Sequence, residues 1–139
     1  MRGGKRIPKK NQPARYLSLI CYNFSMAWRV ETLNLEVDEE LNALDADLRA
    51  KFLRVSELIE MFGPGQVHEP HVKPVHGQGF ALWEMRMGGR AGIARALYVT
   101  QVKERVVVLH AFVKKTPKTP PKALRIAKKR YEVLLARIN

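Results

Sequence analysis

The sequence predicts a single α+β domain: a strand, a helical hairpin, a three-stranded antiparallel meander that completes one four-stranded sheet, and a closing basic helix. Three observations support this class. The 139 residues and 15.9 kDa suffice for one hydrophobic core. The composition, 46% hydrophobic and 27% charged with one cysteine, excludes wholesale disorder, collagen-like repeats and a disulfide scaffold. Apolar residues recur every three or four positions in the first half and then alternate, as a helix-to-strand change requires.

The first half contains one strand and a helical pair. Residues 28–33 are mostly large or β-branched and predict the strand. Helical spacing follows, at Leu41, Leu44, Leu48, Phe52, Val55, Ile59 and Phe62. Asp45-Ala46-Asp47 can supply a break and a new N-cap, so we favour a hairpin over one long helix. Gly63-Pro64-Gly65 ends the segment.

Residues 64–79 are predicted to form a loop. They contain three prolines and the histidines His68, His71 and His76, a combination that raises the question of a metal site. The spacing places no two imidazoles on one face with a carboxylate or thiolate partner, and Cys21 belongs to another segment. We therefore interpret them as solvated loop histidines and expect neither a metal nor another cofactor.

Three strands are predicted over residues 80–87, 93–101 and 105–114. The links between them are short, which makes successive strands antiparallel neighbours. Alternation directs Trp83 and Met85 toward one face and Arg86 toward the other. Arg86 and Lys114 would then form a cationic concavity together with Arg95 from the strand between them.

A Pro-rich turn precedes a helix predicted over residues 121–137. Its apolar stripe comprises Leu124, Ala127, Tyr131, Leu134 and Ile138. The basic residues off that stripe are Lys122, Arg125, Lys128, Lys129 and Arg130. Both a phosphate-binding face and a merely solvated surface fit this pattern.

The charge is strongly positive and unevenly distributed. Lys and Arg total 25 against 13 acids, giving +12 and a pI of about 10.2. Residues 1–25 contribute +6, residues 26–112 contribute −2 and residues 113–139 contribute +8. This balance predicts a polyanionic partner, and nucleic acid is the first candidate.

Residues 1–25 lack an apolar period and are predicted to be a disordered basic extension. A secretory signal is the rival interpretation, but Asn23 and Ser25 interrupt its short apolar run. We favour Met26 as the natural start, followed by a folded domain over residues 26–139. No run reaches the roughly 18 apolar residues of a membrane span, so we expect a cytoplasmic protein without a membrane partner.

Several short motifs, in order, resemble a known family. They are Lys73-Pro74, Leu82-Trp83-Glu84-Met85-Arg86, Ala94-Arg95-Ala96-Leu97-Tyr98 and the run from Leu109 to Pro120, followed by the basic helix. Over residues 27–138 the chain resembles the RelE/HigB-type toxins of type II toxin–antitoxin systems. The most specific part, His-x-Phe-x-Lys-Lys-Thr-x-Lys-Thr-Pro, is typical of the phage-derived HigB branch. Pro117 departs from it where Gln is common.

The resemblance implies a RelE-like fold with RNA bound across the exposed side of the sheet. It also implies an endoribonuclease that cuts messenger RNA, often on the ribosome, and so inhibits translation. The implied partner is an antitoxin with a helix-turn-helix DNA-binding domain, encoded next to the toxin.

Cleavage by the RNA's own 2′-hydroxyl needs a base, donors for the phosphorane charge and an acid for the departing 5′-oxygen, but no metal. By the matching position in the family, Lys73 is the candidate base. We expect Arg86 to stabilise the phosphate, with Lys114 or Lys115 assisting or protonating the leaving oxygen. His110 can act as acid or base because its ordinary pKa lies near neutrality, although a lone strand histidine is often structural. Arg95 can join the site or pair with Glu84 as scaffolding.

The remaining candidates concern RNA binding. Phe112 can stack on a base or pack against the last helix. The expected phosphate contacts are Lys118, Lys122, Arg125, Lys128 and Lys129. Two other functions stay open from the residues alone: a ParE-like toxin that inhibits DNA gyrase, and an RNA-binding module without catalysis.

Overall fold

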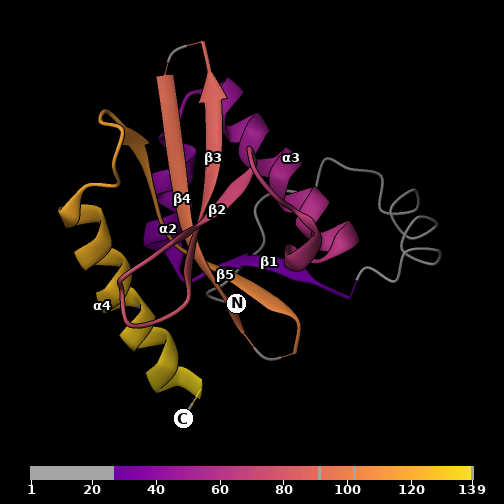
Figure 1. Ribbon diagram of the computed structural model, residues 1–139, viewed down its shortest axis with the longest axis vertical. Coiled ribbons are helices and arrows are strands. Elements are labelled where there is room, and N and C mark those ends of the chain that lie inside the picture. Colours follow the sequence, from indigo (N-terminus) through magenta and orange to yellow (C-terminus); the bar gives the residue numbers. More distant parts are fainter. Residues whose placement is uncertain (1–26, 91, 102, 139) are drawn as a thin grey trace.

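The computed structural model describes residues 27–90, 92–101 and 103–138 (Figure 1). The predicted extension at residues 1–25 and the proposed start at Met26 lie outside the described residues. None of the described helices is long and apolar enough to cross a membrane.

The described chain forms one mixed five-stranded sheet with helices on both sides, which confirms the α+β class. The elements are β1 (Arg29–Thr32), α2 (Leu35–Asn42), α3 (Ala46–Phe62), the 3₁₀ turn η1 (Pro64–Gln66), β2 (Val72–Val75), β3 (Leu82–Gly89), β4 (Gly92–Gln101), β5 (Arg105–Lys114) and α4 (Pro121–Ile138). The strand order is β1-β5-β4-β3-β2, with β1 parallel to β5 and every other pair antiparallel.

The prediction of four strands is wrong because β2 lies within the segment interpreted as a loop. Pro70 and Pro74 hide this strand in the sequence. Proline cannot donate to a ladder and is therefore confined to edge strands, and β2 is the edge of the sheet, paired only with β3. The added strand places Lys73 directly opposite Glu84.

The predicted helical hairpin is confirmed. The Asn34 side chain accepts a hydrogen bond from the Val37 N–H at 3.1 Å and so caps α2. The second helix begins after Asp45, within the predicted break. It ends at Gly63, whose φ of 87° is a conformation that favours glycine.

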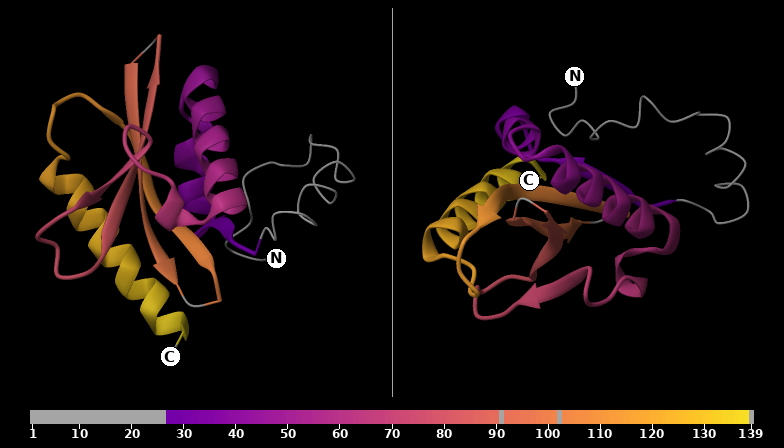
Figure 2. Two further views of the ribbon diagram at one scale, coloured as in Figure 1. Left: turned by 45° about the vertical axis from the view of Figure 1, so that its right-hand side comes forward. Right: turned by 90° about the horizontal axis from the view of Figure 1, so that it is seen from above.

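The two helical layers lie on opposite sides of the sheet, with α3 on one side and α4 on the other (Figure 2, left). Residues directly opposite each other on neighbouring strands share a face. The row Met85, Ala96 and Ala111 is buried in the core together with Leu48, Phe52 and Ile59 of α3. The row Arg86, Arg95 and Phe112 therefore points to the other side.

The apolar stripe predicted for α4 is partly confirmed. Ala127 and Leu134 are buried, and Leu124 and Tyr131 are partly buried against the core. The ring of Tyr131 also stacks on Phe80, with centroids 4.2 Å apart, which ties α4 to the segment before β3. Ile138 departs from the prediction, since it is 47% exposed at the end of the helix.

Candidate functional site

Four of the predicted cationic residues meet on the polar face of the sheet. Arg86 of β3 lies opposite Arg95 of β4, and Lys114 ends β5 opposite Ile93 of β4. Lys73 joins them from the unpredicted strand β2, through its pairing with β3. We call Lys73, Arg86, Arg95 and Lys114 the cationic cluster. The convergence expected from strand order and alternation is therefore present.

A buried carboxylate, Glu84, lies at the centre of this cluster. Its side chain is 0% exposed, and its Oε1 accepts a hydrogen bond from the Thr119 hydroxyl at 3.1 Å. Its Oε2 lies 3.6 Å from Arg95 Nε, close enough for an ion pair but too far for a hydrogen bond. Arg95 instead donates from Nη1 to its neighbour's carbonyl, that of Ala94, at 2.9 Å. The pairing of Arg95 with Glu84 that the sequence left open is thus the observed arrangement.

Two buried side-chain atoms in this pair, Glu84 Oε2 and Arg95 Nε, have no hydrogen-bond partner among the described residues. Leaving such atoms unpaired is costly, because each has lost its hydration. An arrangement of this kind is expected where a bound group completes the hydrogen bonding.

The electrostatics of the cluster favour an anion and a proton-transferring lysine. Lys114 is only 8% exposed. Burial lowers its pKa below the ordinary value, and the charges of Arg95, Lys73 and Arg86 lower it further while Glu84 acts in the opposite direction. The pKa of Arg95 is also lowered, first by burial and then by Arg86, against the influence of Glu84.

His110 lies in a separate cluster at the edge of β5. Its Nδ1 is 2.9 Å from Glu40 Oε1, and its ring stacks on Phe112 with centroids 5.1 Å apart. In the sheet it lies opposite Leu97 of β4, which in turn lies opposite Glu84 of β3. His110 therefore shares the polar face with the cationic cluster, but its hydrogen bond is to Glu40 of α2.

The same carboxylate of Glu40 holds Arg130 of α4. Arg130 Nη2 lies 2.9 Å from Glu40 Oε2, and Arg130 Nη1 donates to the Leu109 carbonyl at 2.9 Å. Burial raises the pKa of Glu40, but hydrogen bonds from His110, Arg130 and the Ala111 N–H outweigh it and lower the pKa to about 2. Arg130 is thus held within the fold, as is Arg137, which donates to the Leu33 carbonyl at 2.9 Å, whereas Lys122, Arg125, Lys128 and Lys129 are exposed.

The remaining predicted RNA contacts lie on the surface. Phe112 is partly buried beside Arg95 and His110. The predicted cations that are exposed are Lys115, Lys118, Lys122, Arg125, Lys128 and Lys129. Lys115 follows Lys114 directly but is exposed to solvent, whereas Lys114 is buried. This difference distinguishes the two lysines that the sequence offers for assisting Arg86 or protonating the leaving oxygen.

Two residues of these clusters, Thr119 and Glu40, were not predicted from the sequence. Thr119 lies within the run that resembles HigB, so its position was visible but its hydrogen bond was not. No pattern in the sequence points to Glu40, because its hydrogen-bonding partners His110 and Arg130 lie 70 and 90 residues further along the chain.

His68, His71 and His76 are exposed. Within the described part of the chain, no three His, Cys, Asp or Glu side chains are grouped so that they could hold a metal ion.

Comparison with known families identifies the family of the chain. Residues 39–132 match the family described as Phage derived protein Gp49-like, which is more than half of the chain. The chain belongs to this Gp49-like family. The family is of the RelE/HigB-like toxin type, which places the chain in a toxin–antitoxin context. No curated protein matches the chain.

The Gp49-like match runs from α2 to α4 and includes the whole cationic cluster. It also includes Glu40, Glu84, Thr119 and Arg130. Both polar clusters therefore belong to the part of the chain that the family shares.

Proposed function

We propose that this Gp49-like protein is the toxin of a type II toxin–antitoxin system, of the HigB-like branch, and acts as an endoribonuclease. Its substrate is messenger RNA, cut on the ribosome in the cytoplasm, and the result is inhibition of translation and growth. The observation that supports this proposal is the cationic cluster gathered around Glu84 on one face of the sheet.

The proposed reaction uses the RNA's own 2′-hydroxyl and needs no metal. A base removes its proton, the 2′-oxygen bonds to phosphorus, and the bond from phosphorus to the 5′-oxygen breaks. The products are a 2′,3′-cyclic phosphate and a 5′-hydroxyl that has accepted a proton. The protein must therefore move two protons and stabilise the added negative charge on the phosphorane.

The cluster offers groups for each task. The guanidinium of Arg86 can donate two parallel hydrogen bonds to phosphate oxygens. Arg95 Nε lacks a hydrogen-bond partner among the described residues, and a phosphate oxygen would supply one. Lys114, with its lowered pKa, is the group best suited to proton transfer, and Lys73 stands at the opposite side of the cluster as the base implied by the resemblance.

The other predicted groups have lesser roles in this scheme. His110 is bound to Glu40 and positions the edge of β5, and Lys115 and Lys118 contact RNA phosphates from the exposed turn. The cognate antitoxin, with a helix-turn-helix domain, neutralises the toxin by covering the cationic face or by blocking entry to the ribosome.

A cleavage assay with matched variants tests the proposal. Purified protein is incubated with messenger RNA, with and without ribosomes, and the products are mapped. We expect Arg86→Ala and Lys114→Ala each to lower the cleavage rate by about 100-fold or more, because each removes a group that acts in the transition state. Lys51→Ala removes an exposed cation from α3 on the other side of the sheet and should cut like the unmodified protein.

Other outcomes would identify a different function. Intact RNA together with inhibited DNA gyrase would replace the proposal by a ParE-like activity. RNA binding without cleavage would leave a binding module, and full cleavage by both cluster variants would remove the assigned site.

A further inference from the structure

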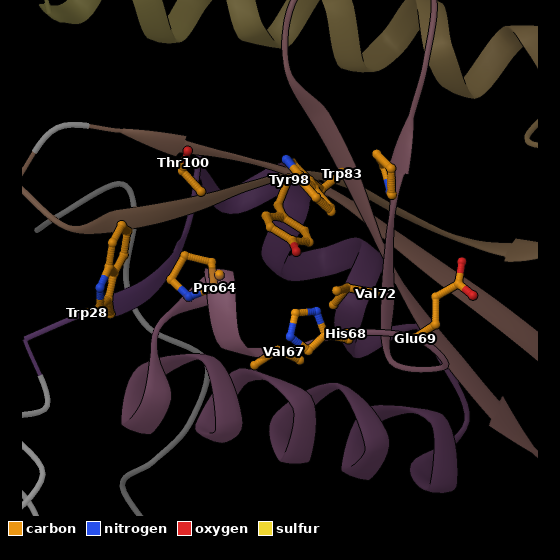
Figure 3. A pocket seen from close by; sticks show the side chains of 11 residues that line it. Trp28, Pro64, Val67, His68, Glu69, Val72, Trp83, Tyr98 and Thr100 are labelled. Atoms are coloured by element: carbon orange, nitrogen blue, oxygen red, sulfur yellow. The ribbon is translucent and has the colours of Figure 1, made fainter.

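A cavity lies on the face of the sheet opposite the cationic cluster. It has a volume of about 620 Å³, which is within the range of small-molecule sites. Its walls include Trp28, Pro64, Pro74, Trp83 and Tyr98 (Figure 3). The proposed cleavage reaction makes no use of this cavity.

The sheet itself separates the cavity from the cationic cluster. Pro74, Trp83 and Tyr98 form one row across β2, β3 and β4. Each of the first two is the sequence neighbour of a residue in the polar row, Lys73 and Glu84, and neighbours along a strand point to opposite faces. Trp28 and Pro64 close the cavity from the segments before β1 and after α3.

The hydroxyl of Tyr98 is an unused polar group in this wall. The residue is 1% exposed, and no described residue hydrogen-bonds its hydroxyl. In Figure 3 the hydroxyl points from the sheet into the space bordered by Pro64, His68 and Val72. Burial raises the pKa of this phenol above its ordinary value, so the hydroxyl stays protonated and can both donate and accept. The hydroxyl faces the cavity and is therefore available to hydrogen-bond a ligand there.

The lining also defines the charge and shape of that ligand. The indole, phenol and proline rings offer flat apolar surfaces on which a planar ring can stack. The lining contains no Lys or Arg, and Glu69 lies at its exposed rim, so an anionic group would be repelled. The ligand is therefore a neutral planar ring with a hydrogen-bonding edge.

We infer that this cavity binds the base of a nucleoside, stacked on the aromatic walls with its polar edge hydrogen-bonded to the Tyr98 hydroxyl. Among neutral planar rings, nucleobases combine a stacking face with donors and acceptors along one edge. This binding does not depend on the cleavage activity, because the two sites lie on different faces of the sheet.

Tryptophan fluorescence tests the inference directly. The chain contains two tryptophans, Trp28 and Trp83, and both line the cavity, so the emission reports on this site. The probes are adenosine, guanosine, cytidine and uridine, all without phosphate. We expect saturable quenching by at least one of them. Tyr98→Phe removes only the hydroxyl and should weaken that binding about fivefold.

Two further variants complete the design. Trp28→Leu removes a partly exposed wall and should also weaken binding, reported by the remaining Trp83. Lys114→Ala alters the cationic cluster alone and should bind the nucleoside as the unmodified protein does, which separates this inference from the cleavage proposal. Thermal melting of each variant confirms that it folds.

Three results would overturn the inference. One is the absence of saturable quenching by all four nucleosides. Another is equal affinity in the unmodified protein and Tyr98→Phe. The third is equal or tighter binding of plain indole, because that would show an apolar cavity without recognition of a polar edge.

Discussion

Lys114 is held in an environment that disfavours its own charge. It is buried, and Arg95, Arg86 and Lys73 all act against its protonated form. A residue selected for stability alone would be apolar at this position, because burying a charged amino group costs free energy that an apolar side chain does not cost. The cost of keeping a lysine here is what a functional role predicts.

This reasoning predicts that Lys114→Met stabilises the fold while it removes cleavage. We expect a gain of about 1 kcal/mol in the free energy of unfolding at neutral pH. The folded-state pKa of Lys114 lies below its unfolded value, so the unfolded state binds more protons and the penalty in the unmodified protein shrinks as pH rises toward 10.5. Urea denaturation at neutral and alkaline pH should show the two proteins converging. A Lys114→Met protein less stable than the unmodified one at neutral pH would contradict this account.

Thr119 positions the turn before α4 by its hydrogen bond to Glu84. Thr119→Val keeps the shape of the side chain and removes the donor, which should cost about 1–2 kcal/mol and lower the cleavage rate because Lys118 and the start of α4 lose their anchor. Thr119→Ser keeps the hydroxyl and should restore most of both. Equal cleavage rates in the Val and Ser variants would show that the hydrogen bond has no positioning role.

At the scale of elements, the second half of β5 is an edge that two helices protect. The pairing of β1 with β5 ends where the Leu33 N–H donates to the Val108 carbonyl at 3.0 Å. Beyond it, the Leu109 carbonyl accepts from Arg130 and the Ala111 N–H donates to Glu40 at 3.0 Å. The ion pair between Glu40 of α2 and Arg130 of α4 thus takes the place of a neighbouring strand along this part of β5. It hydrogen-bonds the Leu109 carbonyl and the Ala111 N–H, which would otherwise be free to pair with a strand of another molecule.

Glu40→Gln should change how stability depends on acid. The folded-state pKa of about 2 lies below the ordinary value of 4.5, so the carboxylate contributes stability that is present above pH 4.5 and is lost as pH falls toward 2. The glutamine variant should be about 1–2 kcal/mol less stable at neutral pH and should lose less over that window. Thermal melts across the window, with the exposed Glu39→Gln as control, provide the measurement. Identical acid profiles for the unmodified and Glu40→Gln proteins would contradict the assignment.

The features that the sequence predicts are those set by local rules. The break at Asp45 followed from N-cap chemistry, and the meeting of Arg86, Arg95 and Lys114 followed from alternation on short-linked strands. The strand β2 was missed because Pro74 within it and Pro70 just before it are typical of a loop, and proline fits a strand only at the edge of a sheet. The place of His110 depends on Glu40, 70 residues earlier, and no local pattern reports such a contact.

At the scale of the whole molecule, the positive charge of residues 26–139 is concentrated at the C-terminal end. Residues 113–139 contribute +8, while residues 26–112 contribute −2. Four of the exposed cations of α4 are Lys122, Arg125, Lys128 and Lys129, and the helix begins at the turn that Thr119 fixes to the cationic cluster. An RNA whose reacting phosphate lies at the cluster can therefore continue along α4.

The salt dependence of RNA binding decides whether this helix face is a binding surface or only a solvated one. Replacing all four residues by Gln leaves Arg130, which the fold requires, in place. If each contacts one phosphate of a single strand, the slope of log K against log salt should become shallower by about 3. Filter binding of a non-cleavable 2′-deoxy substrate over a salt series measures this slope. Lys114→Ala should change it by at most about 1, although cleavage is lost. An unchanged slope in the fourfold variant would show that the charge of α4 serves solubility and that RNA is held by the sheet alone.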